Sequence, residues 1–277
     1  MQRPTLGVCS WSLRPHSIDD LIASLNRVGV TAVQLALKPF VEPIEDDWTE
    51  RWGNGCARLR DAGIEVASGM LETVGEDYTT LDSIKETGGV RPDATWTSTL
   101  ARAREVAQFA ENERIALVTF HAGFIPHEAH DHARRAILGR LRVLADLFAN
   151  HGAQIAFETG QESAITLADA LKELDRPSVG INFDPANMIL YGMGNPVDAL
   201  ELLAPCVRQI HIKDAIASAQ IGEWGTEVPV GDGGVDWKQF LACANRVVPS
   251  ARFVIEREAG ETRERDIQQA IALLGTV

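Results

Sequence analysis

Short apolar runs alternate with longer amphipathic stretches along the whole chain. Each run has four to seven residues, is rich in Val, Ile, Leu and Phe, and has the length of a buried parallel strand. Eight such runs occur, and the pattern predicts strands at residues 5–9, 31–37, 63–69, 115–121, 153–158, 179–184, 207–213 and 252–256.

Helix start and stop signals lie between these runs. Ser17 is expected to cap a helix that runs to Val28 and ends at Gly29, and Asp236 to cap a helix that runs to Val248. Thr97 is expected to cap a helix that ends near Asn112. Further helices are predicted at residues 130–150, 167–174, 197–203 and 262–274.

Strands and helices that alternate without a break indicate parallel strand pairing. Eight repeats in 277 residues fit the size of a closed (β/α)8 TIM barrel, which is the predicted fold. A doubly wound open sheet is the alternative, but the turn after the first run, VCSWSLRP, has no spaced glycines. No composition shift or Ser/Gly-rich linker divides the chain, so residues 1–277 are interpreted as one domain.

Two connections are longer than a βα repeat requires. They are residues 70–96, which include GEDYTT, and residues 214–235, which include GEWGTEVPVGDGG. In a barrel both lie on the face where the strands end, which is the face that carries active sites. The alternatives for each are a lid over a site or plain surface decoration.

Composition and charge narrow the class of protein. The formal net charge is −13 and the sequence pI is about 5.0, which argues against nucleic acid or an anionic membrane as a partner. No run approaches the roughly eighteen apolar residues of a membrane span, and the N-terminus lacks a signal-peptide pattern. A cytoplasmic protein with four unpaired thiols is expected, at Cys9, Cys56, Cys206 and Cys243.

Four polar residues end four consecutive apolar runs, where burial is costly unless each is paired. They are Glu158, Asp184, His211 and Glu256. In a parallel barrel these four ends share one rim, where three unpaired acids would repel one another and take up protons. One divalent ion (magnesium, manganese, zinc or cobalt) bound by all four would keep them charged. Any one of them alone is more often a solvent-boundary acid or a hydrogen-bonded core histidine.

The motifs around these residues resemble a known family, the xylose-isomerase-like TIM barrels of sugar phosphate isomerases and epimerases. The family includes ketose 3-epimerases and inosose dehydratase and isomerase proteins. The resemblance rests on Glu158, FDPANM (183–188), HIKD (211–214), VGDG (230–233) and IERE (255–258). It implies one divalent metal bound by Glu158, Asp184, His211 and Glu256, with the two glutamates as the acid/base pair acting on a carbohydrate.

Those roles suit proton removal next to a carbonyl. The enediolate that forms is stabilised by a divalent cation acting as a Lewis acid, while two carboxylates remove and return the proton. A metal-dependent sugar isomerase or epimerase is therefore the leading hypothesis. One departure from the ketose 3-epimerases concerns their substrate-binding histidine shortly after the aspartate ligand. Here that segment contains Asn187, which cannot titrate near neutral pH.

Because of this departure a second hypothesis stays open, in which the protein is a metal-dependent lyase or dehydratase that uses the same enolate to expel an oxygen. Endonuclease-IV-like DNA repair would need more histidine ligands and a basic groove. A non-catalytic sugar-binding barrel is disfavoured because both Glu158 and Glu256 are present. No phosphate cradle is visible, which favours an unphosphorylated sugar. The sequence leaves open the particular sugar, the metal and whether the chain forms a homo-oligomer.

Five further residues are candidates for contact with the substrate. They follow strands or ligands, and each also has a structural alternative as a core residue or a salt-bridged rim residue: Trp11, His121, Gln161, Asn187 and Lys213. Gln34 is expected to face the same rim only if the register of its strand places it there.

Overall fold

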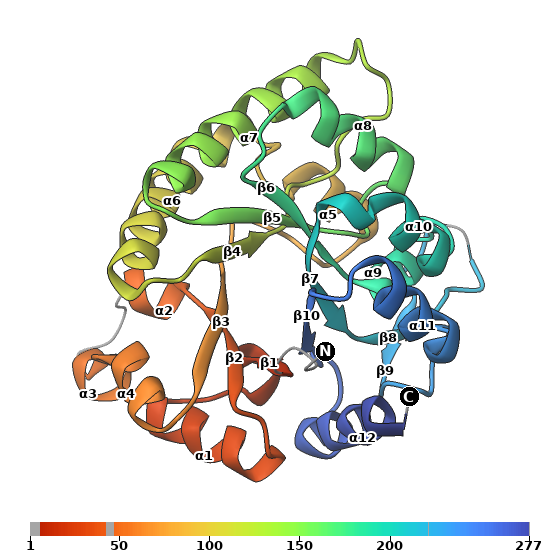
Figure 1. Cartoon of the computed structure of the whole chain (residues 1–277). Helices are drawn as coiled ribbons and strands as arrows, with labels where there is room; N and C mark the ends of the chain where they lie inside the picture. The colour runs from red at the N-terminus through yellow and green to blue at the C-terminus, as the bar shows by residue number, and fades with distance from the viewer. Residues whose placement is uncertain (1–5, 43–46, 221, 277) are drawn as a thin grey trace.

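Eight parallel strands close into a barrel (Figure 1). The computed structural model describes residues 6–42, 47–220 and 222–276. The barrel strands, each hydrogen-bonded to the next, are β1 (Gly7–Cys9), β2 (Ala32–Ala36), β3 (Glu65–Met70), β4 (Leu117–Phe120), β5 (Gln154–Glu158), β6 (Val179–Phe183), β7 (Val207–Ile212) and β10 (Arg252–Ile255). Because β10 pairs with β1, the sheet has no edge, which confirms the (β/α)8 barrel and excludes the open sheet. Of the first predicted strand, Thr5 lies outside the described residues.

Helices surround the barrel, and the predicted caps at two of them are confirmed. The hydroxyl of Ser17 accepts the amide of Asp20 at the start of α1 (Ile18–Val28), and Gly29 ends that helix with a φ of 77°. Asp236 caps α11 (Trp237–Val247). The other long helices are α6 (Asp93–Glu113), α7 (His132–Asn150), α8 (Ala164–Leu174), α10 (Pro196–Leu203) and α12 (Arg263–Thr276).

Two helix starts differ from the prediction. Helix α6 begins at Asp93 after Pro92, so Thr97 lies inside it, because proline fixes an extended residue before the first turn and Asp93 suits the positive end of the helix dipole. Helix α8 begins three residues early, because the hydroxyl of Ser163 accepts the amide of Thr166 before the apolar periodicity begins.

The long connections contain short elements of their own. The connection after β3 contains α5 (Leu81–Thr87), and the one after β7 contains the antiparallel pair β8 (Asp214–Ile216) and β9 (Thr226–Val228). The other short elements are η1 (Ser10–Leu13), α2 (Lys38–Val41), α3 (Trp48–Trp52), α4 (Gly55–Asp61), α9 (Pro185–Leu190) and η2 (Ala204–Cys206). Sequence periodicity did not predict these because none is long enough to show a repeating pattern.

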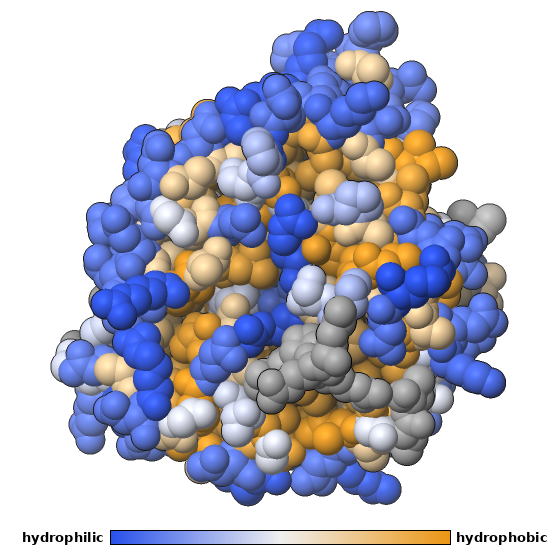
Figure 2. All heavy atoms as spheres, viewed as in Figure 1, coloured by the Kyte–Doolittle hydropathy of each residue, from blue (hydrophilic) through white to orange (hydrophobic). Residues whose placement is uncertain are grey.

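The apolar core lies between the strands and the outer helices. Phe183 of β6 stacks on Phe240 of α11 with ring centroids 5.9 Å apart, and both rings are fully buried. Figure 2 shows hydrophilic side chains on the outward faces of the helices and hydrophobic ones gathered further in. All four cysteines are free thiols, as predicted. Within the described residues, each helix is too short or too polar to cross a membrane.

Asp214 holds the connection after β7 in place. Its fully buried carboxylate accepts five hydrogen bonds, from the backbone amides of Ala215, Gly231, Gly233 and Val235 and from the indole of Trp237. A Cβ on Gly233 would lie 2.1 Å from Asp214 Oδ1, so the carboxylate approaches to a distance that only glycine allows. This contact joins the HIKD and VGDG motifs and explains, in structural terms, why the aspartate and the glycines occur in them.

We expect Asp214→Asn to lower the free energy of unfolding by about 2–4 kcal/mol, because an amide NH₂ would then face N–H donors. Urea denaturation followed by circular dichroism measures this. Asp232→Asn, an exposed position in the same connection, is the matched control and should change stability little. Equal stability of the two variants would contradict the assigned role.

Candidate metal centre

The four predicted ligands come together at the carboxyl ends of their strands. Glu158 is the last residue of β5, Asp184 follows β6, His211 lies one residue before the end of β7, and Glu256 follows β10. All are at most 4 % exposed. One ligand atom from each can be chosen so that all four atoms lie within 4.8 Å of one another.

The imidazole of His211 lies at the centre of this group. Its Nδ1 is 3.2 Å from Glu256 Oε2, 3.6 Å from Glu158 Oε1 and 3.7 Å from Asp184 Oδ2. Metal–ligand bonds of about 2.0–2.2 Å place ligand atoms up to about 4.4 Å apart, so small adjustments would bring all four around one ion. One nitrogen and carboxylate oxygens suit a hard or borderline divalent cation.

Asp184 provides the clearest test of whether a cation fits. Its Oδ1 caps α9 by accepting the amides of Ala186 and Asn187, but its buried Oδ2 has no hydrogen-bond donor. The nearest ammonium, Lys213 Nζ, is 4.0 Å away. Burial raises the pKa of Asp184 to about 6, against the opposing effects of His211 and Lys213, which reflects the cost of burying this charge. A divalent ion beside Oδ2 would remove that cost.

The charge of His211 leads to the same conclusion. Burial opposes its protonation, but the carboxylates of Glu256 and Glu158 raise the pKa of His211 well above its usual value. Without a cation, a proton on Nδ1 offsets part of the negative charge. A metal ion would take the place of this proton because both require the same lone pair.

The layer below the cluster fixes the orientation of the histidine. His211 Nε2 donates to Gln34 Oε1 at 2.8 Å, which leaves Nδ1 directed at the carboxylates. The Gln34 amide is itself held, because its Nε2 donates to Thr119 Oγ1 at 2.7 Å and its Oε1 accepts from Gln209 Nε2 at 2.8 Å. These residues are fully buried, so Gln34 lies inside the barrel, one layer below the rim.

We expect Gln34→Leu to weaken binding of Mn²⁺ by about 10–100-fold, the usual cost of losing a partner that orients a ligand. Calorimetric titration measures the affinity. Gln34→Glu keeps an acceptor for Nε2 and should restore most of it. Unchanged affinity in a folded Gln34→Leu protein would show that the ring is oriented by something else.

A cavity of about 560 Å³ opens above the cluster and contains most of the predicted substrate residues. Trp11, His121, Asn187 and Lys213 line it, together with Glu158 and Glu256. Gln161 is buried, its Nε2 has no hydrogen-bond partner, and it does not belong to this lining. The structure therefore brings four of the five candidates to the cavity.

Three of those candidates also hold the two glutamates. Trp11 Nε1 donates to Glu256 Oε1 at 2.8 Å, and Lys213 Nζ donates to Glu256 Oε2 at 2.9 Å. Asn187 Nδ2 donates to Glu158 Oε1 at 2.8 Å. Glu256 thus has a cationic partner, whereas Glu158 receives bonds from neutral amides, a second one coming from Asn182.

The groups around Glu256 and Glu158 also shift the pKa values of these two glutamates. Burial opposes ionisation of Glu256, but Lys213 and His211 hold its pKa well below the usual range. The pKa of Glu158 is also lowered, against burial, by the imidazoles of His121 and His211. The buried Nδ1 of His121 has no partner, and although burial opposes protonation, Glu158 and Glu76 raise its pKa.

Sequence reasoning missed the outer wall of the cavity. Tyr78, Tyr191 and Trp224 line it, as do Glu72, Glu76 and Glu227. Most of these come from the two long connections, where no periodicity shows which way a side chain points. The aromatic residues within GEDYTT and GEWGTE were the only available signal.

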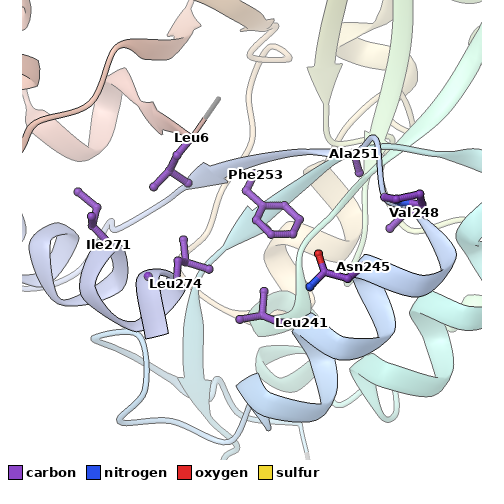
Figure 3. A pocket seen from close by; sticks show the side chains of 10 residues that line it. Leu6, Leu241, Asn245, Val248, Ala251, Phe253, Ile271 and Leu274 are labelled. Atoms are coloured by element: carbon purple, nitrogen blue, oxygen red, sulfur yellow. The ribbon is translucent and has the colours of Figure 1, made fainter. Parts of the chain in front are cut away.

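A second cavity of about 260 Å³ lies at the opposite end of the barrel (Figure 3). Leu6 precedes β1 and Ala251 precedes β10, so this cavity is at the amino ends of the strands. Leu241, Phe253 and Ile271 line it, and none of its described lining residues is titratable. It offers no group for chemistry, in agreement with catalysis at the carboxyl ends in barrels of this kind.

The chain belongs to the xylose isomerase-like TIM barrel family, whose sequence model matches residues 22–277. A solved structure of a xylose isomerase domain protein from Planctomyces limnophilus is 31 % identical, with a TM-score of 0.86 over 99 % of this chain and 96 % of that one. Among curated proteins, the uncharacterized protein YihM of Escherichia coli (strain K12) is 33 % identical over 117 residues. That match covers 37 % of this chain and only 35 % of YihM.

Two more distant structures share the fold. One is the probable 3-DHS dehydratase AsbF from Bacillus anthracis, 18 % identical, with a TM-score of 0.72 and 98 % of each chain covered. The other is the 3-keto-D-glucoside 4-epimerase YcjR from E. coli, 16 % identical, with a TM-score of 0.71 over 99 % of this chain and 100 % of that one.

Proposed function

We propose that the protein is a divalent-metal-dependent isomerase or epimerase that acts on a sugar by removing a proton next to a carbonyl. The observation that carries the proposal is the buried set of three carboxylates and one imidazole, with Asp184 Oδ2 unpaired, beneath a cavity lined by Glu158 and Glu256. The family supports the same class of enzyme, and so do the similar structures, which include an epimerase and a probable dehydratase.

A magnesium, manganese, zinc or cobalt ion held by Glu158, Asp184, His211 and Glu256 would supply Lewis-acid stabilisation of negative charge on the substrate oxygens. Glu158 is the better base of the two glutamates, because its hydrogen-bond donors are neutral amides, whereas Glu256 is paired with the ammonium of Lys213. It takes the proton from the carbon next to the carbonyl.

Glu256 and Lys213 lie where they can return a proton to the substrate. Lys213 Nζ lies 2.9 Å from Glu256 Oε2, and both line the cavity. Return of the proton to the opposite face of the same carbon inverts it and gives epimerisation. Return to the neighbouring carbon gives isomerisation.

A lyase or dehydratase remains the second candidate, and one observation favours it. Lys213 provides a buried ammonium at the cavity, 2.9 Å from Glu256 and 2.8 Å from Glu258. Such a group can donate a hydrogen bond to a departing hydroxyl and stabilise the negative charge that develops on it. Asn187 occupies the segment where ketose 3-epimerases carry a histidine, which removes one titrating group from the epimerase arrangement.

Deuterium exchange tests the proposed reaction. Incubated with Mn²⁺ in D₂O and a panel of ketoses and keto-sugars, the protein should introduce deuterium next to the carbonyl of at least one substrate. Glu158→Gln should slow the exchange by about 10²–10⁴-fold, the usual contribution of a positioned base, and Glu256→Gln should also slow it. Mass spectrometry and NMR measure the exchange.

Glu105→Gln, exposed on α6 away from the cavity, is the matched control and should exchange at the wild-type rate. Appearance of an unsaturated product would identify the lyase. Exchange that persists in both Glu158→Gln and Glu256→Gln would contradict the assigned roles.

A further inference from the structure

The outer part of the candidate cavity is strongly acidic. Six glutamates and two lysines line the whole cavity, and none of its described lining residues is an arginine. Four of the glutamates lie outside the four-ligand cluster: Glu72, Glu76, Glu227 and Glu258. Both ammonium groups are already paired. Lys38 donates to Glu72 at 2.7 Å, and Lys213 donates to Glu256 at 2.9 Å and to Glu258 at 2.8 Å. The lining residues therefore include four more carboxylates than ammonium groups.

Two of these six glutamates, Glu227 and Glu76, are held in place by hydrogen bonds. Glu227 Oε1 accepts from Arg257 at 2.7 Å and from the backbone amide of Glu258 at 2.9 Å. Glu76 accepts only neutral donors among its described hydrogen bonds, from the amide of Gly89 and the hydroxyl of Tyr78. A phosphate ester, which carries nearly two negative charges at neutral pH, would meet these carboxylates, and both ammonium groups of the lining are already paired.

One side of the cavity is aromatic. Tyr191, which follows α9, and Trp224, which lies between β8 and β9, both line the cavity and meet edge to face, with centroids 4.9 Å apart and planes at 62°. Phe124 packs against Tyr191 at 5.6 Å. An aromatic face is electron-rich, so the polarised C–H groups of a sugar or the edge of a second ring can pack on it.

One polar group of this wall also lacks a partner. The Nε1 of Trp224 is buried and has no acceptor among the described residues. Buried donors are normally satisfied, so this one is available to a hydroxyl-bearing ligand or to water.

The cavity is also larger than one sugar ring. At the about 30 Å³ that a water molecule occupies in the liquid, the roughly twelve non-hydrogen atoms of a hexose would fill at most about 360 Å³. The cavity measures about 560 Å³.

From these observations we infer the substrate class of the site: an uncharged sugar that carries a second ring, as in a glycoside, and not a sugar phosphate. This inference rests on the proposed function, because it takes the reacting ring to lie above the four-ligand cluster. The second ring packs against Tyr191 and Trp224, and the acidic wall excludes phosphate esters.

Binding of unreactive glycosides tests the inference separately from catalysis. The probes are methyl β-glycosides of glucose, galactose and mannose, the matching phenyl β-glycosides, and the 6-phosphates of the methyl glycosides. Calorimetry on the Mn²⁺-supplemented full chain should show at least one phenyl glycoside binding tenfold or more tightly than its methyl counterpart. Each phosphate should bind tenfold or more weakly than its uncharged parent.

Variants assign these preferences to residues. Trp224→Leu should abolish the preference for the phenyl group, and Trp224→Phe should retain it, with melting temperatures confirming that both are folded. Glu76→Gln should reduce the discrimination against the phosphates, whereas the exposed Glu105→Gln should leave it unchanged.

The inference would be overturned if the phosphates bind as tightly as their parents, or if the phenyl glycosides bind no more tightly than the methyl glycosides. A preference for the phenyl group that survives in Trp224→Leu would also overturn it. Because no turnover is needed, failure of the proposed reaction is distinguishable. Correct binding preferences without deuterium exchange in any keto-sugar would contradict the reaction and leave the substrate class standing.

Discussion

Three buried carboxylates and one imidazole converge at the end of this barrel, and their charge must be balanced. The chain alone balances it only in part. Lys213 neutralises Glu256, and a proton on His211 offsets part of the remaining negative charge. Burial raises the pKa of Asp184. Charges at this depth are stable only when paired, and this imbalance is the physical reason for proposing a bound cation. The proposed chemistry depends on that cation.

The fold keeps the two ends of the barrel chemically different. At the amino ends of the strands, Leu6, Phe253 and Ile271 surround an apolar cavity. At the carboxyl ends, a buried layer of neutral amides supports His211 from below, and a polar cavity opens above it. The layer of Gln34 and Gln209 is costly to bury but fully hydrogen-bonded, so it fixes the direction of the imidazole without adding charge.

Much of the architecture could be predicted because parallel strands carry a strong signal. Each strand is a short, nearly pure apolar run, so a single polar residue at its end is conspicuous, as Glu158 and Glu256 are. Once the barrel is assumed, the ends of β5, β6, β7 and β10 must be neighbours, which predicts that the ligands converge. The direction of the Gln34 side chain, in contrast, depended on the register of β2, which the sequence leaves open.

The outer part of the cavity was less predictable because the connections that form it carry no periodic apolar pattern. Tyr191 and Trp224 approach each other from separate connections, and no period in the sequence relates them. Gln161 follows a ligand closely, but a turn at Gly160, with a φ of 127°, separates it from β5, and it does not line the cavity. Asp214 closely follows the predicted ligand His211 in the sequence, yet its oxygens accept hydrogen bonds from backbone amides and an indole.

The most direct test of the central claim is a count of bound ions. Purified protein stripped with a chelator, supplied with Mn²⁺ and dialysed should hold one ion per chain by elemental analysis. Asp184→Asn, which removes the charge next to the unpaired oxygen, should hold far less while remaining folded. If the wild-type protein retains no ion, or the Asp184→Asn protein retains as much as the wild type, the four side chains do not form the metal centre described above.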